Sequence, residues 1–366
     1  MAPTTPLTVL CAGDRFITAE TLAAAARDAL GANSRDVVTL LHDSDWPDVP
    51  FRSVDGVREA AGEVSELVDL VAGADVLLTH LAPVTAAVLE AGTALRLVGS
   101  VRGGPVNIDV DAATRCGVPV TYLPGRNLGA VAEFVVAAMI TAPRGLMTAS
   151  HALRGGRWDA GAFRFERTGT ELRVSTVGLV GLGAVGTRVA ELVGAFGATV
   201  LAHDPYADPA RVPAGVELVE LDELCTRCDV VSVHARLTDQ TRGMFDAAVF
   251  AAMKPGVCFV NTARGELVVE AALADALASG RVGSAALDVW NPEPPATDNP
   301  LLADPRVMAT PHLAGASRQV ALESATKVAR AAASFLRDGT LEHCANPEVL
   351  GQPGALGVLR ATTRQG

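Results

Sequence analysis

Three side chains that could handle a proton and an anion follow separate predicted strands in the second half of the chain. Arg264 lies in the segment NTARG (261–265), Glu293 in DVWNPEP (288–294) and His312 in TPH (310–312). In open α/β sheets, ligands bind beyond the carboxyl ends of the strands. We therefore expect all three side chains at the edge of one cleft.

These residue types suit hydride transfer to a 2-oxo acid. The reaction needs a cation that holds the carboxylate and polarises the ketone, and Arg264 offers a rigid, bidentate guanidinium. It also needs a proton donor, which we assign to the imidazole of His312, with Glu293 to hold its tautomer and favour its protonated form. Taken singly, the three could be a helix brace, a solvated loop acid and an interior histidine. Their joint placement behind the dinucleotide motif described next favours the catalytic interpretation.

A glycine-rich turn follows the predicted strand at 174–180 and opens a helix. It reads GLGAVG (181–186), and the apolar residues that follow it recur on one helical face. Gly181 allows a tight turn, Gly183 lets the backbone approach a pyrophosphate, and Gly186 lets the helix lie close to the strand. The amide groups at the helix N-terminus, including those of Ala184 and Val185, then meet the phosphate charge.

Asp204 ends the next predicted strand, about 20 residues after the glycines. A carboxylate at this place accepts hydrogen bonds from the adenosine ribose hydroxyls and repels the 2′-phosphate of NADP. No arginine directly follows Asp204, so the sequence favours NAD over NADP. The alternative is an aspartate that only caps the turn at Pro205.

Four further residues at strand ends are assigned to the cofactor cleft. Asp288 could accept a hydrogen bond from the carboxamide of the nicotinamide, and His234 is expected to line the cleft without doing chemistry. Thr262 and Ala263 precede Arg264 and are placed beside the cofactor with it.

The elements that must position these residues form two alternating series. In the first series, Leu- and Val-rich runs predict strands at 7–13, 36–41, 75–81, 95–101 and 118–123, and Ala-rich runs predict helices at 18–30, 57–71, 85–91 and 108–116. In the second, strands are predicted at 174–180, 198–204, 229–234, 257–261, 284–289 and 307–310. This order predicts an α/β fold of two doubly wound, parallel-sheet domains.

A helical pattern from 130 to 153 connects the two series, and Pro143 should kink or split it. A last helix at 317–336 is expected to return to the first lobe. We therefore predict a substrate domain of residues 1–123 and 316–345, and an NAD-binding Rossmann domain of residues 124–315. Residues 346–366 form a tail without periodicity, which we expect to be loose or docked as irregular chain.

Composition excludes several classes of protein. The 366 residues are 49% hydrophobic and 19% charged, which suits compact domains, and the net charge of -11 would repel nucleic acids and anionic membranes. No apolar run has the length of a membrane span or a secretory signal, so we expect a cytoplasmic protein. Cys225 and Cys228 form a lone CxxC without a second pair or nearby histidines, so we expect structural thiols and no metal.

Together these segments resemble the D-isomer-specific 2-hydroxyacid dehydrogenase family, which includes phosphoglycerate, glycerate and D-lactate dehydrogenases. The resemblance covers roughly residues 70–340 and rests on GLGAVG (181–186), HDP (203–205), MKPG with VNTARGE (253–266), ALDVWNPEP (286–294) and TPHLAGAS (310–317). It implies Arg264, Glu293 and His312 as the catalytic arginine, glutamate and histidine, with Asp204 and Asp288 on the cofactor. It also implies a flavodoxin-like substrate lobe, a Rossmann lobe and a homodimer built through the cofactor domain.

The first lobe carries a segment similar to the family's substrate loop. Arg102, Gly103 and Gly104 precede Asn107, where backbone amides would grip the substrate carboxylate, and glycines allow close approach. The segment reads RGGPVNID, longer than the usual Gly-x-Gly-x-Asp-Asn. Arg102 could add a second cation for an acidic or phosphorylated substrate, or could be an ordinary exposed arginine.

Two other functions are compatible with the same fold. Corepressors that resemble this family sense NAD through a similar cleft, so an NAD-sensing regulatory or scaffold protein is the alternative to a dehydrogenase. Formate dehydrogenase also resembles the family but lacks the glutamate partner of the histidine, and Glu293 argues against it.

Overall fold

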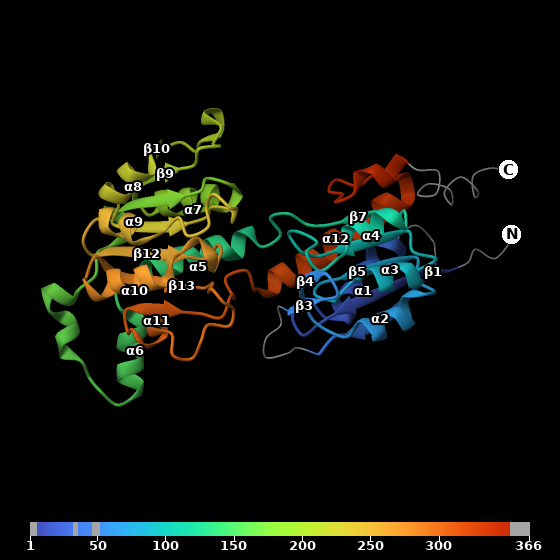
Figure 1. Ribbon diagram of the computed structural model, residues 1–366, viewed down its shortest axis with the longest axis horizontal. Helices are drawn as coiled ribbons and strands as arrows, with labels where there is room; N and C mark the ends of the chain where they lie inside the picture. Colours follow the sequence, from blue (N-terminus) through green and yellow to red (C-terminus); the bar gives the residue numbers. More distant parts are fainter. Residues whose placement is uncertain (1–5, 32–35, 46–51, 352–366) are drawn as a thin grey trace. The chain divides into compact units, whose positions relative to one another are not determined.

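The computed structural model describes residues 6–31, 36–45 and 52–351 (Figure 1). The chain folds into two compact units. Unit 1 consists of Met1–Arg126 and Ser317–Gly366, and unit 2 of Asn127–Ala316.

Unit 1 is built on a five-stranded sheet in the order β2-β1-β5-β6-β7, with all neighbours parallel. This is the flavodoxin-like order, as expected. The strands are β1 (Leu7–Gly13), β2 (Val37–Asp43), β5 (Val76–Thr79), β6 (Leu97–Ser100) and β7 (Val120–Thr121). Strands β5 and β6 are buried along their whole length, because helices cover both faces of a parallel sheet.

Two layers of helix cover this sheet. One face carries α1 (Ala19–Gly31) and α12 (Arg318–Asp338), which lie side by side in Figure 1. The other carries α2 (Val64–Val71), α3 (Ala86–Ala91) and α4 (Val110–Arg115). The last long helix thus returns to the first unit, as its sequence position predicted.

One predicted element of unit 1 is wrong. Residues 57–71 are not one helix: the antiparallel hairpin β3 (Arg52–Val54) and β4 (Val57–Ala60) comes first, and α2 begins only at Val64. Asp55 and Gly56 turn the chain at positive φ, 42° and 88°. Within the predicted range, Glu59 and Gly62 also have positive φ, 49° and 102°. A helix cannot continue through these two positions, so Val57–Ala60 pair as a strand and the helix begins after them.

Unit 2 has a seven-stranded parallel sheet in the order β10-β9-β8-β11-β12-β13-β14. Its strands are β8 (Thr176–Val180), β9 (Thr199–His203), β10 (Val216–Leu218), β11 (Val230–Val233), β12 (Val257–Asn261), β13 (Val282–Leu287) and β14 (Val307–Ala309). The order reverses between β8 and β11, which makes the carboxyl ends of these two strands the switch point of a Rossmann sheet. The predicted fold class is confirmed in both units.

Helices also cover both faces of the second sheet. On one face lie α5 (Leu128–Thr141) and α7 (Ala184–Ala195). On the other lie α8 (Leu221–Arg227), α9 (Ala247–Ala252) and α10 (Glu270–Ala278), where Phe245, Phe250 and Phe259 pack edge to face or tilted. Short elements complete the unit: α11 (Pro300–Ala303) and 3-10 turns at Ala160–Phe163, Phe165–Arg167, Leu172–Val174, Pro209–Arg211 and Gly265–Leu267.

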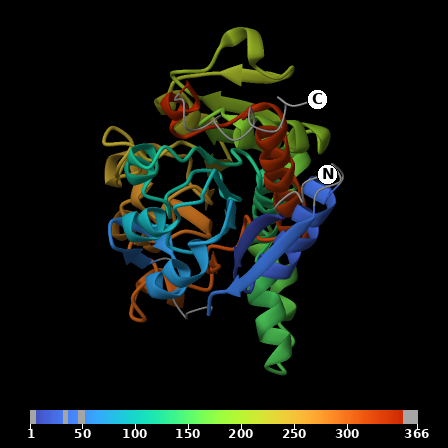
Figure 2. The same cartoon turned by 90° about the vertical axis from the view of Figure 1, so that its right-hand side faces the viewer.

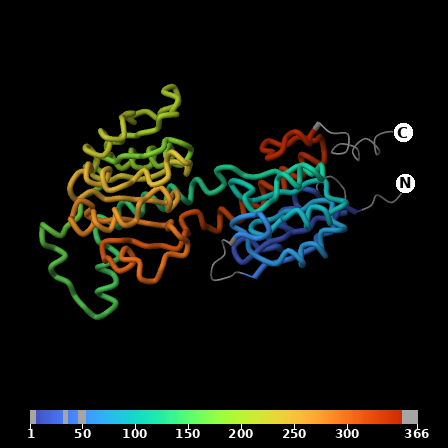
Figure 3. The backbone as a smooth tube through the Cα atoms, viewed as in Figure 1, coloured from blue at the N-terminus to red at the C-terminus, as the bar shows by residue number. Residues whose placement is uncertain are grey.

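The connector splits at Pro143, as predicted. Helix α5 ends at Thr141, Gly145 turns the chain at φ 59°, and α6 (Leu146–Arg154) leaves at 72° to α5. Figures 2 and 3 show this green segment extending away from the rest of unit 2. Within the described ranges no single helix has the length and apolar composition of a membrane span, although α5 and α6 taken together do.

The beginning of the tail docks beside β7. Asn346 is buried and bonds both the amide of Val120 and the carbonyl of Val118, after which a 3-10 turn (Pro347–Gly351) follows. The beginning of the tail is therefore docked, and residues 352–366 lie outside the described part of the chain.

Candidate active site

The glycine loop has the geometry that its spacing predicted. Gly181 follows β8 at φ 100°, and a Cβ there would lie 2.6 Å from the backbone nitrogen of Ala235. A Cβ on Gly186 would lie 2.1 Å from the carbonyl oxygen of Gly181. Both positions accept only glycine, because backbone atoms occupy the space of any larger residue.

The start of α7 fits a pyrophosphate. Gly183 is the N-cap residue, no side chain caps the helix, and a Cβ on Gly183 would meet nothing within 4 Å. Gly183 and Ala184 are exposed. The first-turn amides, which no helical carbonyl can satisfy, are therefore open to an anion.

Asp204 directly follows β9 and connects two turns. Its Oδ2 accepts the amide of Leu182 at 2.8 Å, and its Oδ1 accepts the amide of Tyr206 at 2.9 Å. An ionised carboxylate has about four acceptor positions. Asp204 thus does cap its own turn, and it keeps acceptor positions for ribose hydroxyls.

His234 lies beside the glycines at the other side of the switch point. Its amide donates to the carbonyl of Val180 at 2.7 Å, and a Cβ on Gly186 would lie 3.7 Å from the Cβ of His234. Its Nε2 is enclosed without a hydrogen-bond partner among the described residues, and burial lowers the pKa of the imidazole to about 4. The imidazole of His234 is therefore uncharged near neutral pH, and the residue packs against the glycine loop.

Asn261 shapes the turn that presents Arg264. At the end of β12, its side-chain oxygen accepts the amide of Ala263 at 3.0 Å and its side-chain nitrogen donates to the carbonyl of Arg264 at 2.9 Å. The hydroxyl of Thr262 in the same turn is buried and has no hydrogen-bond partner in the part of the chain that the structure describes. The guanidinium of Arg264 is exposed and donates to the carbonyl of Ala263 at 2.7 Å.

The arginine turn and the glutamate turn lie directly against each other. A Cβ on Gly265 would meet the carbonyl oxygen of Trp290 at 2.1 Å. The amide of Trp290 donates to Oε1 of Glu293 at 3.0 Å, and its indole donates to the carbonyl of Thr310 at 3.0 Å. Trp290 therefore connects the segments that carry Arg264, Glu293 and His312.

Glu293 and His312 form the predicted pair. Oε2 of Glu293 lies 2.9 Å from Nδ1 of His312. Burial alone would raise the pKa of the Glu293 carboxyl, but the hydrogen bond and charge of His312, with the Trp290 amide and the charge of Arg264, lower it. An ionised carboxylate only accepts, so Nδ1 carries a hydrogen and proton exchange with a substrate falls to Nε2.

Asp288 holds the histidine loop. The carboxylate is buried and accepts the hydroxyl of Thr310 at 2.7 Å and the amides of Leu313 and Ala314, each at 2.8 Å. His312 itself has a positive φ of 51°, a conformation that needs such support in a residue other than glycine. The sequence suggested only a cofactor contact for Asp288, because its backbone partners follow more than 20 residues later.

Glu270 is a second positioning residue that the sequence did not reveal. From the start of α10 it accepts the amide of Asn291 at 2.8 Å and the side chain of Asn299 at 2.6 Å. It thus holds both sides of the loop that carries Glu293. Glu270 follows no motif, and only the fold brings it to this loop.

The remaining predicted site residues belong to unit 1. Arg102 follows β6, and its guanidinium, 13% exposed, pairs with Glu59 of the β3–β4 hairpin. It is therefore not an ordinary exposed arginine. A Cβ on Gly103 would have only the carbonyl oxygen of Leu123 within 4 Å, at 3.8 Å. A Cβ on Gly104 would meet nothing within 4 Å.

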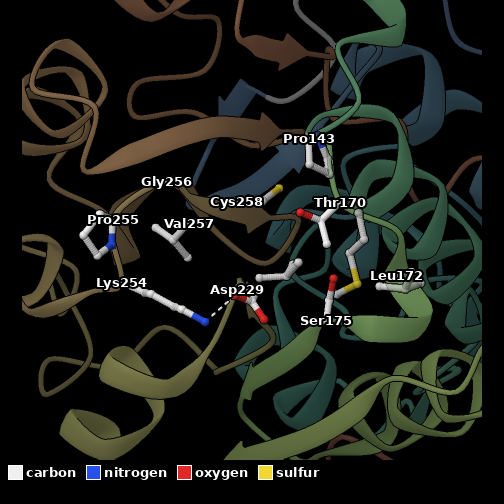
Figure 4. Close-up of a pocket in the computed structure, with 12 residues that line it drawn as sticks. Pro143, Thr170, Leu172, Ser175, Asp229, Lys254, Pro255, Gly256, Val257 and Cys258 are labelled. Carbon is white, nitrogen blue, oxygen red and sulfur yellow. Dashed lines mark hydrogen bonds and ion pairs between the residues drawn. The ribbon is translucent and has the colours of Figure 1, made fainter. Parts of the chain in front are cut away.

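A cavity of about 170 Å³ in unit 2 lies away from these residues (Figure 4). Ser175, Asp229 and Val257 line it at the amino ends of β8, β11 and β12, and Lys254 pairs with Asp229 at 2.6 Å. The glycine loop and the catalytic segments follow the carboxyl ends of the same sheet. The cavity is therefore not the reaction site.

Comparison with known proteins decides the family. The NAD-binding domain of the D-isomer-specific 2-hydroxyacid dehydrogenases matches residues 136–314. A hydroxypyruvate reductase of Thermotoga maritima is 37% identical over 273 residues, which are 73% of this chain and 87% of that protein. The chain belongs to the D-isomer-specific 2-hydroxyacid dehydrogenase family. NAD is the cofactor of its unit 2.

One further relative and one solved structure are also similar to this chain. The D-3-phosphoglycerate dehydrogenase of Mycobacterium tuberculosis is 43% identical over 283 residues, 77% of this chain and 52% of that protein. The chain thus spans about half the length of these curated relatives. A solved protein of Thermus thermophilus superposes with a TM-score of 0.75 at 28% identity, covering 93% of this chain and all of that one.

No cluster of three or more His, Cys, Asp or Glu side chains that could hold a metal lies among the described residues. Cys225 and Cys228 are buried free thiols, and burial raises their pKa values to about 11 and about 12. High pKa values and burial both favour the structural interpretation of this pair.

Proposed function

We propose that the protein transfers a hydride between NAD and a small D-2-hydroxy or 2-oxo acid. The observation that carries the proposal is the Glu293–His312 pair, joined through Trp290 to the turn of Arg264. Bound NADH supplies the hydride. A proton donor and a cation at the carboxyl edge of the same sheet are the two groups that reduction of a 2-oxo acid requires.

Each residue has a separate task in this proposal. Arg264 holds the substrate carboxylate and polarises the ketone, while Nε2 of His312 delivers the proton to the oxygen that becomes the hydroxyl. Glu293 orients the imidazole and stabilises its charged form. In the oxidative direction, His312 takes the hydroxyl proton as a general base.

Further residues are proposed to bind the ligands. The amides of Gly183, Ala184 and Val185 meet the pyrophosphate, supported by the uncapped start of α7. Asp204 takes the ribose hydroxyls, and Asp288 keeps one acceptor position for the carboxamide. His234, Thr262 and Ala263 flank the cofactor. The loop of Arg102, Gly103 and Gly104 holds the substrate carboxylate through the amides of the two glycines, since the Arg102 amide donates to Oγ of Ser100.

We also infer a homodimer formed through unit 2. Large apolar side chains are exposed on α6 and the turns after it: Met147 57%, Leu153 57%, Trp158 76%, Phe163 85% and Phe165 89%. A patch of this kind on a projecting segment is typical of an interface. The unpaired thiols of the described residues suit a cytoplasmic protein.

The test is NADH oxidation with a panel of 2-oxo acids, including sugar-derived and phosphorylated ones. Turnover with at least one acid, and D-configured product, supports the dehydrogenase. Tight NADH binding without turnover of any acid would instead favour the sensor that the fold also permits.

A further inference from the structure

The cavity of Figure 4 has no role in the mechanism above. Its volume is about 170 Å³, close to that of an engineered apolar cavity of about 150 Å³ that holds a benzene molecule. It lies at the amino edge of the unit 2 sheet, whereas the glycine loop and the segments of Arg264, Glu293 and His312 follow the carboxyl edge. A molecule in this cavity would therefore displace neither NAD nor the substrate.

The inner wall of the cavity is apolar and buried. It is formed by α5, by the turn before β8 and by the first residues of β11 and β12. These lining side chains are between 1% and 8% exposed: Met139, Leu172, Val230, Val257 and Cys258. Water is held poorly at such a wall, because a buried water needs several polar partners. The wall favours an apolar ligand body instead.

The rim of the cavity carries the Lys254–Asp229 ion pair, which Figure 4 shows as a dashed line. Oδ2 of Asp229 also accepts the amide of Thr176 at 2.9 Å, so the carboxylate is fixed at the start of β8. The amide of Lys254 donates to the carbonyl of Cys225 at 3.1 Å, which fixes the backbone beneath the ammonium. Both members of the pair are therefore in place before a ligand arrives.

This ion pair has hydrogen-bonding capacity left. An ammonium has more than one N–H, and a carboxylate has about four acceptor positions. In the described part of the chain, Lys254 uses one donor and Asp229 accepts only from Lys254 and Thr176. The pair has no net charge, and a charged ligand would lose its hydration on entering. The complementary head group is uncharged and both donates and accepts, as a primary carboxamide does.

The cavity also lies at the root of residues 143–172, which we call the arm. The arm leaves unit 2 at Pro143 and returns at Thr170 and Leu172, and all three line the cavity. A Cβ on Gly169 would lie 2.2 Å from the carbonyl oxygen of Pro143, so the two ends of the arm are in contact. A ligand here would touch both ends of the arm and the strands β11 and β12.

We propose that this cavity is a second ligand site, which binds a small uncharged molecule with an apolar body about the size of a benzene ring and a carboxamide head on the Lys254–Asp229 pair. The bound molecule fastens the arm to the sheet. The inference goes beyond the proposed function and does not depend on hydride transfer. Since the arm carries the exposed apolar side chains assigned above to an interface, the site would regulate how the arm is presented.

The experiment uses benzamide as the probe and calorimetric titration of the full chain as the readout. A ligand of this size should bind with a dissociation constant of about 0.1–1 mM. Toluene lacks the head, and benzoate and benzylamine replace it with a single charge, so each should bind about tenfold more weakly or worse. No binding of benzamide would overturn the site, and equal binding of any of the other three would overturn the assigned head group.

Substitutions place the probe in the cavity. Thr170 is exposed on the rim, so Thr170→Phe should close the cavity and abolish binding, whereas Thr168→Phe changes an exposed residue of the arm that does not line it. Lys254 and Lys327 are the two lysines of the sequence. Lys254→Met should weaken benzamide about tenfold, and Lys327→Met should not. The melting temperature of each variant reports folding, and unchanged binding in both Thr170→Phe and Lys254→Met would overturn the proposal.

Two further measurements complete the test. Saturating NADH should leave the dissociation constant of benzamide unchanged; displacement by NADH would put benzamide in the cofactor site and overturn the proposal. Saturating benzamide should slow amide hydrogen exchange in α6 of the unsubstituted protein and not in Thr170→Phe. Exchange in α6 that benzamide does not alter would overturn the link between the cavity and the arm. Neither result depends on whether any 2-oxo acid is reduced.

Discussion

The amide of His312 donates to the carbonyl oxygen of Asp288 at 2.8 Å, and the Asp288 carboxylate accepts the amides of the next two residues after His312. His312 is thus fixed by its backbone as well as by Glu293. This arrangement makes Asp288 a positioning residue, whatever it contributes to the cofactor.

Asp288→Asn should therefore reduce both stability and turnover. An asparagine leaves one of the amides facing an N–H group instead of an oxygen, which costs about 2–3 kcal/mol when buried. Urea unfolding should show that loss, and kcat should fall because His312 is displaced. Asp298→Asn, in an exposed loop nearby, should change neither quantity; unaltered stability in Asp288→Asn would contradict the role given to its carboxylate.

Two glycines of α7 offer a matched pair. In Gly186→Ala the new Cβ would lie 2.1 Å from a carbonyl oxygen, whereas in Gly194→Ala it would meet nothing within 4 Å. We expect Gly186→Ala to lose about 2–3 kcal/mol of stability and its affinity for NADH. Gly194→Ala should keep NADH binding and gain up to about 1 kcal/mol. Fluorescence titration with NADH and chemical unfolding measure both, and equal behaviour of the two variants would refute a tight glycine loop.

Asp204→Asn tests the choice of dinucleotide. Removal of the negative charge should weaken NADH and relieve the repulsion of the 2′-phosphate, so the preference for NADH over NADPH should fall at least about tenfold, or 1.4 kcal/mol. Dissociation constants of both cofactors supply the ratio. A ratio that does not move would mean that Asp204 only caps the turns at Leu182 and Tyr206.

His234 predicts how stability depends on pH. Its pKa of about 4 in the fold lies below its ordinary value of 6.5. The unfolded chain therefore takes up a proton at His234 before the folded chain does. The folded state is fully stable in this respect above pH 6.5, and its free energy of unfolding falls by up to about 3 kcal/mol as the pH falls from 6.5 towards 4. His234→Asn should flatten this part of the unfolding free energy profile. Parallel profiles for the two proteins would show that the imidazole is accessible to protons in the fold.

The sequence correctly predicted the elements that depend on residues close together in the chain. Strand β12 begins and ends at the residues predicted, and the glycine loop has the geometry its spacing required, because both depend on neighbours within a few residues. Strand β10 was not predicted, because Val216–Leu218 is a short edge strand with two exposed side chains and so lacks an apolar run. Strand β4 was predicted as the start of a helix because Val57–Ala60 is short, although the Asp55-Gly56 pair before it is typical of a hairpin turn.

Longer-range positioning could not be predicted. Asp14 and His80 are 66 residues apart, and only the adjacency of β1 and β5 in the sheet brings them together. The same holds for Asp288 and its partners, and for Glu270 and the loop of Glu293. These residues come close only because of the order of the strands in the sheet. A single sequence indicates that order only where a recognisable motif follows a strand.

The proposed mechanism assigns the proton transfer to His312. Its most direct test is the rate of hydride transfer in His312→Gln, mixed rapidly with NADH and an accepted 2-oxo acid, beside the dissociation constant of NADH. We predict a rate lower by about 10²–10⁴-fold, unchanged NADH binding, and no effect of His343→Gln, which removes a partly exposed histidine of unit 1. Hydride transfer at the unsubstituted rate in His312→Gln would contradict the mechanism.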